Sequence, residues 1–277
     1  MIQTPIHRVL STIRKHDVKS LLMGGQACIF YGAAEFSRDT DLAILADTDN
    51  LGRLTQALRD LDAEAIAVPP FEKKYLDRGH SIHFSCRRAD VKRMRLDVMS
   101  TMRGVAAFPS LWDRRTTASI RGMGDLDIMS LPDLVAAKKT QCDKDWPMVR
   151  RLVEANYFAF RDEPTPERVR FWLLELRTPE LLMEAVGAHA TEAAEHEKVR
   201  GAVQAAISGR LDEVQNEISA EEARERELDR NYWAPLRAEL EQYPAFYLAF
   251  RERWVVLRSA ERRRPAASAH VSHFWRA

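Results

Sequence analysis

The sequence has few cysteines, no long apolar run and almost no net charge, and each shortage excludes a class of protein. Its three cysteines, Cys28, Cys86 and Cys142, are widely spaced and form no Cys-x-x-Cys pair, so neither a disulfide framework nor a zinc site is indicated. Lys and Arg number 42 against 41 Asp and Glu, so no overall electric field recruits nucleic acid. Any contact with nucleic acid must therefore be local.

Apolar segments long enough for a membrane are also missing, because no run approaches the roughly 20 residues that span a bilayer. The N-terminus instead predicts an amphipathic helix, with Thr4 as N-cap, Pro5 at the first helical position and apolar residues at helical spacing after them. A signal peptide has a different pattern. We therefore expect a cytoplasmic protein with no membrane partner.

The 277 residues are enough for two domains. Residues 1–160 mix strand and helix patterns, whereas residues 161–277 are helical, with proline-marked helix starts at 165–167 and 178–180. We predict an α+β fold: a small mixed sheet with flanking helices, followed by an all-helical C-terminal domain. Its basic tail around residues 262–264 has the Pro, Ala and Ser content typical of disorder.

Asp39 and Asp41 are the most informative residues in the chain. In an extended strand residues i and i+2 point to the same side, with their Cα atoms roughly 6 to 7 Å apart. Magnesium prefers oxygen ligands and commonly lies between one or two protein carboxylates and the phosphates of a substrate. The pair therefore predicts a seat for a hard divalent cation.

A glycine pair, Gly24 and Gly25, precedes the two aspartates. It separates a predicted buried strand, residues 20–23, from a predicted short helix, residues 26–31. Backbone N–H groups at such a strand, turn and helix start can bind an anion. A glycine pair alone is more often a turn, and an isolated Asp-x-Asp is more often solvent-facing. Together they predict a site for a metal-bound polyphosphate.

The two stretches resemble the minimal nucleotidyltransferase fold of the DNA polymerase beta superfamily, whose signature is a Gly-Gly or Gly-Ser turn, a helix and an Asp-x-Asp strand. Residues 24–27 and 37–42 are most similar to its AbiEii-like branch. Thr40 replaces the aliphatic residue usual there, although a β-branched residue suits a strand. The resemblance implies two magnesium ions on Asp39 and Asp41. It also implies nucleotide contacts by Gly24, Gly25, Ser37 and Arg38.

The superfamily also uses a third carboxylate from a neighbouring strand, and Asp97 is the candidate. In the strand pattern of residues 94–99, Leu96 and Val98 share one face and Asp97 points to the other. Residues 81–86 alternate in the same way, and residues 87–90 can turn the chain back. A hairpin would then place Asp97 beside the strand of Asp39 and Asp41, as the third catalytic and metal-binding residue.

A second block, residues 131–139 with Lys144 and Asp145 after it, resembles an AbiEii-like helix that brings a lysine and then a basic-Asp pair to the nucleotide. The implied nucleotide-binding residues are Lys138, Lys139, Lys144 and Asp145. The interval from lysine to Asp145 is shorter than usual in the family. Two other interpretations stay open, because Asp145 also suits a helix N-cap and lysines on helices are commonly solvated.

Several other charged residues receive structural interpretations. Asp125 and Asp127 repeat the Asp-x-Asp spacing, but no helix fits between Gly124 and them, and Ser130 begins a helix with a capping box. His80 and His83 are expected to be surface residues. The charged run 219–230 is expected to be a solvated helix face.

A cluster of basic residues in the predicted hairpin has two open interpretations. It either holds phosphates, of the nucleotide or of an acceptor nucleic acid, or protects a sheet edge. The cluster consists of Arg87, Arg88, Lys92, Arg93 and Arg95.

Together the residues and the resemblance predict a magnesium-dependent nucleotidyltransferase. It would move a nucleoside monophosphate from an NTP such as ATP to an acceptor hydroxyl and release pyrophosphate. The acceptor stays open among tRNA, protein and small molecules. The AbiEii-like branch includes toxins of toxin-antitoxin pairs, so an antitoxin partner is one expectation. The alternative is a catalytically inactive nucleotide-binding or antitoxin-like module, because fold does not fix function.

Overall fold

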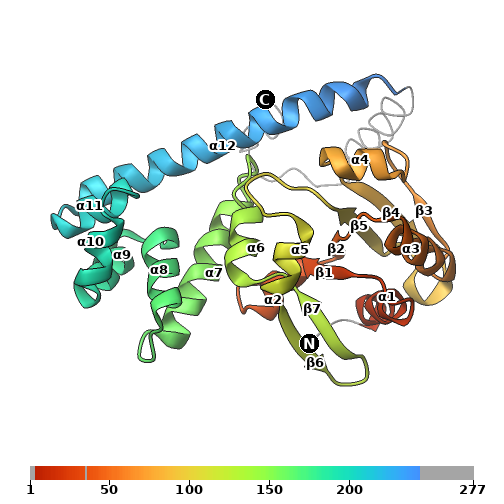
Figure 1. Cartoon of the computed structure of the whole chain (residues 1–277), viewed down its shortest axis with the longest axis horizontal. Helices are drawn as coiled ribbons and strands as arrows, with labels where there is room; N and C mark the ends of the chain where they lie inside the picture. The colour runs from red at the N-terminus through yellow and green to blue at the C-terminus, as the bar shows by residue number, and fades with distance from the viewer. Residues whose placement is uncertain (1–3, 35, 244–277) are drawn as a thin grey trace, which may run out of the picture.

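A computed structural model describes residues 4–34 and 36–243 of the chain (Figure 1). Its seven-stranded mixed sheet has the order β3-β4-β5-β2-β1-β7-β6. The strands are β1 (Ser20–Met23), β2 (Asp39–Ile44), β3 (Ala63–Ala65), β4 (Ile82–Cys86), β5 (Arg95–Met99), β6 (Thr116–Ile120) and β7 (Gly124–Ile128). The predicted strand at residues 20–23 is confirmed with the same bounds.

Helices flank this sheet and make up the rest of the described chain, which confirms the predicted fold class. In the first half they are α1 (Thr4–Lys15), α2 (Gly24–Phe30), α3 (Thr48–Asp60), α4 (Lys73–Arg78), the short 3-10 helix η1 (Ala89–Val91) and α5 (Phe108–Asp113). After β7 come α6 (Leu131–Ala137), α7 (Asp145–Phe160), α8 (Pro166–Glu175), α9 (Pro179–Ala188), α10 (Ala190–His196), α11 (Gly201–Ile207) and α12 (Leu211–Glu241).

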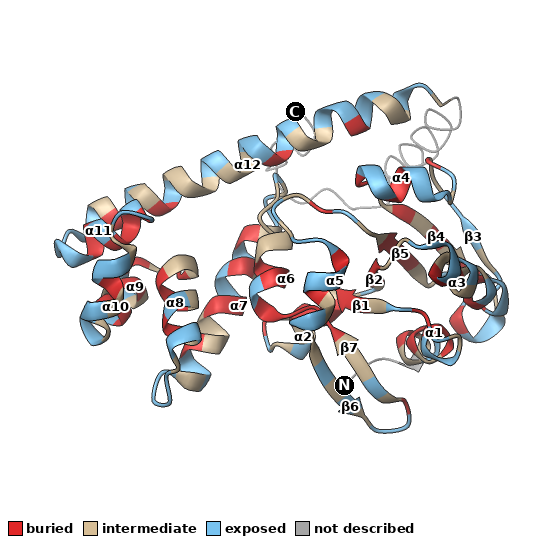
Figure 2. Cartoon of the chain, in the orientation of Figure 1, coloured by how far each residue is buried: buried red, intermediate tan, exposed pale blue. Residues whose placement is uncertain are grey.

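The central strands are held in place because they are apolar on the faces that meet helices. Leu42 and Ile44 of β2 are 1% and 0% exposed, and Leu21 of β1 is 0% exposed. The predicted amphipathic helix is α1, which buries Ile6 and Val9 in the same core. Figure 2 shows this buried material concentrated between the sheet and its helices. The side chain of Thr4 lies outside the described part, so its capping role stays a prediction.

Helix starts follow the local sequence closely. The Asp47 side chain caps α3 by accepting from the backbone N–H of Asn50, and Ser130 caps α6 by accepting from that of Asp133. Thr165 caps α8 in the same way, through the N–H of Arg168. Side-chain oxygens at these positions satisfy N–H groups that have no partner inside the helix. The predicted helix starts at Ser130 and at residues 165–167 are therefore confirmed.

The long helix α12 joins the two halves of the molecule. In Figure 1 it runs from α9, α10 and α11 across to α4, beside the sheet. Asp229 of α12 is 3% exposed and accepts from Arg103 and from the backbone N–H of Gln141. The expectation that residues 219–230 form only a solvated face is wrong at this position. The boundary between residues 160 and 161 falls in the turn after α7 and stays a prediction.

His80 is also placed differently from the expectation. It is 1% exposed, and its Nε2 lies 2.9 Å from Glu239 Oε2 of α12. The surface assignment is wrong. It was based on the position of His80 near the start of a strand, whereas α12, which is distant in sequence, covers this residue. His80 is therefore part of the contact between α12 and the sheet half.

Two further features concern the chain as a whole. Among the described helices, none combines the length and apolarity needed to cross a membrane. The tail around residues 262–264 lies outside the described residues, so the expectation for it is untested.

Thr40 offers a test of the cost of a polar group in this core. It is 0% exposed, and within the described residues its hydroxyl has no hydrogen-bond partner. We expect Thr40→Val to raise the free energy of unfolding by about 1 kcal/mol, because valine keeps the shape and removes the unpaired hydroxyl. Urea denaturation measures this. Thr12→Val is the matched control, since the buried Thr12 hydroxyl donates to Arg8 O at 2.9 Å and its loss should not stabilise.

Candidate functional site

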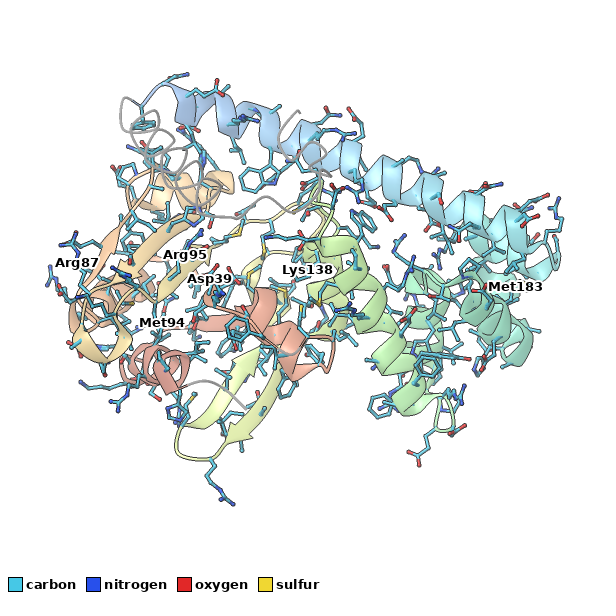
Figure 3. All side chains as sticks on the ribbon, turned by 180° about the vertical axis from the view of Figure 1, so that it is seen from behind. Asp39, Arg87, Met94, Arg95, Lys138 and Met183 are labelled. Carbon is cyan, nitrogen blue, oxygen red and sulfur yellow. The ribbon has the colours of Figure 1, made fainter. Side chains whose placement is uncertain are left out.

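Strand register brings the predicted carboxylates to one face of the sheet. β2 and β5 pair in parallel, with Asp41 opposite Asp97 and Asp39 opposite Arg95. On its other side, Asp41 is opposite Met23 of β1. Because paired residues on adjacent strands share a face, the three aspartates lie on the same side of the sheet. Figure 3 shows Asp39, Arg95 and Lys138 near one another at the middle of the molecule.

The glycine pair lies directly against Asp41. Helix α2 begins at Gly24, two residues before the predicted start, and Gly24 has a φ of +63°. A Cβ atom there would lie 1.9 Å from Asp41 Oδ2, so only glycine leaves room for this carboxylate. The backbone N–H of Gly25 lies close enough to the Asp41 carboxylate to lower its pKa. The carboxylate therefore lies against the start of α2.

Charges around Asp41 are poorly balanced. Burial, followed by the nearby carboxylate of Asp97, raises the pKa of Asp41 from 3.8 to about 6. Lys138 and the Gly25 N–H act in the opposite direction but do not cancel this. A carboxylate that is both desolvated and beside other carboxylates is costly to ionise. Added positive charge at this point would lower that cost.

Asp97 has partners of its own in Arg95 and His83. Arg95 donates from Nε to Oδ1 at 3.2 Å and from Nη2 to Oδ2 at 2.9 Å, and His83 Nδ1 lies 2.9 Å from Oδ1. The expectation that His83 is a simple surface residue is therefore wrong. Its signal was present in the sequence, since the alternation of β4 places His83 on the face of Asp97 once the hairpin forms.

Lys138 and Asp145 reach the same region from the helical side. Lys138 Nζ lies 3.1 Å from Asp145 Oδ1, and the Thr140 hydroxyl donates to Asp145 Oδ2 at 2.6 Å. Asp145 lies in the first turn of α7, but Lys144 occupies the N-cap position, so Asp145 is not the cap. Burial opposes the charge of Lys138, but Asp145 and Asp41 outweigh it and raise the lysine pKa. Sequence reasoning had missed Thr140.

The other predicted nucleotide-binding residues are less central. Lys139 is turned away, with Nζ 2.7 Å from Glu175 of α8, and Lys144 is exposed. Ser37 lies against Gly25, where a Cβ atom would meet Ser37 Oγ at 2.5 Å. Arg38 is exposed, with its guanidinium 5.7 Å from the ring of Phe36. Gly24, Gly25, Ser37 and Lys138 are therefore placed around the aspartates, and Lys139 is not.

The donor set matches magnesium in chemistry. Three carboxylates on one face are the kind of hard oxygen ligands that magnesium prefers, and the raised pKa of Asp41 reflects burial and the neighbouring Asp97. Within the described residues, however, no three His, Cys, Asp or Glu side chains are already gathered as a metal centre. Asp97, for example, is engaged by Arg95 and His83.

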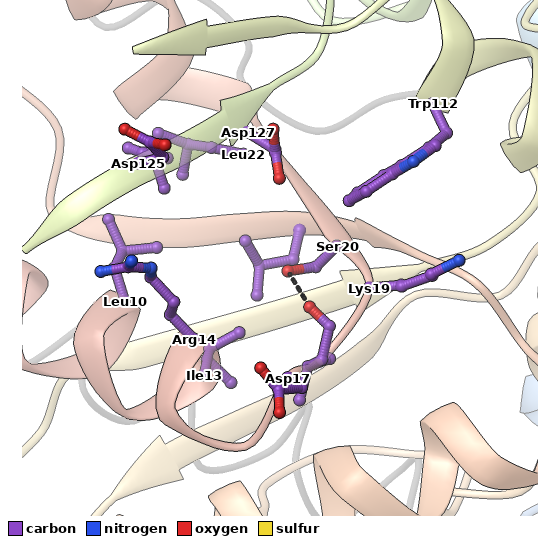
Figure 4. A pocket seen from close by; sticks show the side chains of 13 residues that line it. Leu10, Ile13, Arg14, Asp17, Lys19, Ser20, Leu22, Trp112, Asp125 and Asp127 are labelled. Atoms are coloured by element: carbon purple, nitrogen blue, oxygen red, sulfur yellow. Dashed lines mark hydrogen bonds between the residues drawn. The ribbon is translucent and has the colours of Figure 1, made fainter. Parts of the chain in front are cut away.

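The second Asp-x-Asp pair lies elsewhere, as predicted. Asp127 accepts from Arg115 and Thr117, and Asp125 accepts from Ser119, all within or beside the β6–β7 hairpin. Figure 4 shows both aspartates at a separate cavity of about 240 Å³ near α1 and β1. Its lining includes Leu22 and Leu42, which alternate with Met23 and Asp41 and so point to the opposite face of the sheet.

The arginines of the β4–β5 hairpin are partly occupied. Arg87 pairs with Glu64, and Arg88 pairs with Asp90 and donates to the Asp60 carbonyl. In Figure 3 Arg87 lies at the edge of the molecule, away from Lys138. A role in gripping RNA stays a prediction, but Arg95 clearly faces Asp97 instead of solvent.

Comparison with known proteins leaves function to be argued from this geometry. Neither a protein-family model nor a curated protein matches the chain. Among solved structures, a protein from H. pylori that is provisionally named a nucleotidyltransferase aligns with 81% of this chain and 94% of its own, at 13% identity and a TM-score of 0.36. A similarity of that size carries no argument about fold or activity.

Gly24 is a sharp test of the carboxylate's position. We expect Gly24→Ala to destabilise the protein by more than about 2 kcal/mol, since it adds left-handed strain and also displaces Asp41. Gly32→Ala is the matched control, because Gly32 has a φ of +76° and nothing within 4 Å of its added Cβ. It should cost only about 1 kcal/mol, from strain alone. Equal losses in urea denaturation would contradict the close packing of Gly24 on Asp41.

Asp41→Asn tests the electrostatic strain. Because the folded pKa of about 6 exceeds 3.8, the folded protein keeps a proton that the unfolded chain releases. The contribution of Asp41 to the free energy of unfolding therefore falls as pH rises from about 4 to 6. With a chelator present at about pH 7.5, the Asp41→Asn variant should be more stable than wild type by roughly 1 to 3 kcal/mol. Near pH 3.5 the two proteins should differ little. Urea denaturation across this pH range measures the difference in the free energy of unfolding. A wild type that is more stable than Asp41→Asn at neutral pH would contradict the electrostatic strain at Asp41.

Proposed function

We propose that this protein is a magnesium-dependent nucleotidyltransferase, which moves a nucleoside monophosphate from an NTP to an acceptor hydroxyl and releases pyrophosphate. The parallel register that sets Asp41 opposite Asp97, with Asp39 on the same face, carries the proposal. The Gly24 turn packed on Asp41 and the approach of Lys138 support it. Carboxylates, a helix start and a lysine are the parts that phosphoryl transfer needs, because it depends mainly on positioning and charge neutralisation.

Each residue has a defined role in this proposal. Asp39 and Asp41 would hold two magnesium ions, and Asp97 would contribute to one of them. When bound, these ions neutralise the triphosphate and lower the pKa of the acceptor hydroxyl. Gly24 and Gly25 present backbone N–H groups to the β and γ phosphates, which requires Asp41 to leave the Gly25 N–H.

The basic side chains complete the site. Lys138 adds positive charge beside the phosphates, and Asp145 and Thr140 hold it in place. Arg95 and His83 position Asp97, and they would have to release its carboxylate for it to hold a metal ion. ATP is one candidate NTP. The acceptor hydroxyl belongs to tRNA, a protein or a small molecule, and a toxin paired with an antitoxin is one biological setting for such an enzyme.

One observation favours the alternative of a catalytically inactive nucleotide-binding or antitoxin-like module. The Arg95 guanidinium binds both oxygens of Asp97, the position where the proposed enzyme needs a metal ion. In a permanently inactive protein, arginine would replace the ion at this carboxylate. The two candidates differ in whether Asp41 and Asp97 are required for nucleotide transfer.

Transfer of label from α-labelled NTP separates these candidates. With magnesium and pools of total tRNA, total protein or aminoglycosides, wild type should label one pool. We expect Asp41→Asn to lower that labelling about a hundredfold or more while the protein stays folded, because the lost charge acts on the reacting phosphates. Asp125→Asn is the control, since it changes the same residue type on the β6–β7 hairpin. Equal labelling by wild type and Asp41→Asn would favour the inactive module.

A further inference from the structure

A second cavity, of about 430 Å³, lies between α7 and α12 and has no part in the site described so far. It is called the α7–α12 groove here. The residues lining it are Asp143, Trp146, Pro147, Arg150, Arg151, Glu154, Arg177, Ile218, Glu222 and Arg226. Four of these are arginines and three are acidic, so an anion is the natural ligand to consider.

The acidic residues do not neutralise the groove. Two of the three acidic residues, Asp143 and Glu222, form ion pairs with Arg226. Within the described residues, Arg150 and Arg151 have no ion-pair partner, and both are exposed. Glu154 accepts a hydrogen bond from the neutral Thr178 hydroxyl, so its charge offsets only one of these two arginines. Positive charge therefore remains along this part of α7.

The buried Arg177 adds to this excess at the groove. It is 4% exposed, and its contacts to Glu221 and Glu175 are long, 3.5 and 3.8 Å. Those two carboxylates already serve closer cations, since Glu221 binds Arg200 and Glu175 binds Lys139. In the described structure the Arg177 Nε is buried with no hydrogen-bond partner. The unpaired Nε, together with the long contacts to both carboxylates, leaves the Arg177 guanidinium with donor capacity for an anionic ligand, although Glu175 Oε2 is also unpaired nearby.

The groove is connected directly to the candidate active site through Trp146. Guanidinium groups of Arg177 and Arg226 lie 4.9 and 5.6 Å from its ring centre. The Trp146 indole N–H donates to the carbonyl of Thr140 at 2.9 Å, and the Thr140 hydroxyl holds Asp145. Trp146 and Arg177 are each only 4% exposed, so the accessible positive charge of the groove comes mainly from the exposed Arg150 and Arg151.

We propose that the α7–α12 groove binds backbone phosphates of a nucleic-acid strand whose terminal hydroxyl is the acceptor, a role that rests on the proposed nucleotidyltransferase activity. Guanidinium groups match phosphate oxygens in a planar, two-point geometry. The charges extend along α7 from Arg150 to Arg151 and across to Arg177, and the cavity is too large for one phosphate ion alone. Recognition is through phosphates, so it is independent of base sequence.

Binding of a fluorescein-labelled single-stranded RNA of twelve nucleotides to the full chain tests this proposal. Measurement by anisotropy with EDTA present keeps it independent of metal and of nucleotide transfer. The Arg150→Ala, Arg151→Ala double variant should bind about tenfold more weakly, and the slope of log affinity against log salt should fall by about 1.4, because two phosphate contacts are lost. Both residues are exposed, so the fold should be unaffected.

The matched control is Arg170→Ala with Arg224→Ala, which removes two exposed charges outside the groove. It should bind the RNA nearly as well as wild type. The proposal is overturned if the two double variants bind alike, or if uridine monophosphate or inorganic phosphate displaces the RNA at equal phosphate concentration. The two proposals can also be separated. If the groove variant loses RNA binding while Asp41→Asn labels as well as wild type, the groove is still a strand-binding surface but the proposed enzyme activity is rejected.

Discussion

The parallel pairing of β2 with β5 is the constraint on which the rest of the site depends. It places Asp41 beside Asp97 at a buried position, where two like charges repel and burial makes each costly. Several neighbouring groups compensate for this arrangement: the Gly25 N–H and Lys138 act on Asp41, and Arg95 and His83 act on Asp97. A purely structural sheet would gain more stability from apolar residues at these two positions.

The compensating groups come from two different parts of the fold. On the α7 side, Lys138 is itself held by Asp145 and Thr140, so its position depends on the helical half of the molecule. On the sheet side, Arg95 comes from the same strand as Asp97, and His83 comes from the neighbouring β4. The site is therefore closed by the docking of α7 as well as by the sheet. Damage to that docking would displace Lys138 without touching any aspartate.

Local patterns in the sequence predicted much of this arrangement, but they failed where long-range contacts determine the position of a side chain. The strand at residues 20–23, the helix cap at Ser130 and the face of Asp97 all follow from alternation or capping within a few residues. His80 was misassigned because its partner, Glu239, is 159 residues away. Lys139 has the same residue type and neighbours as Lys138, yet only tertiary packing sends it to Glu175. No local signal separates the two.

The same limit applies to the arginines, and it determines which of them can bind a ligand. The sequence showed a basic cluster at the β4–β5 hairpin, but Arg87 and Arg88 have carboxylate partners within the fold. Arg150 and Arg177 are far apart in sequence and suggested nothing, yet they line one groove in which acidic residues are too few or already engaged. Since the chain carries a net charge of only +1, attraction of an anion depends on such local imbalance. The density of arginine in a sequence is therefore a weaker guide to anion binding than the number of its carboxylate partners in the folded protein.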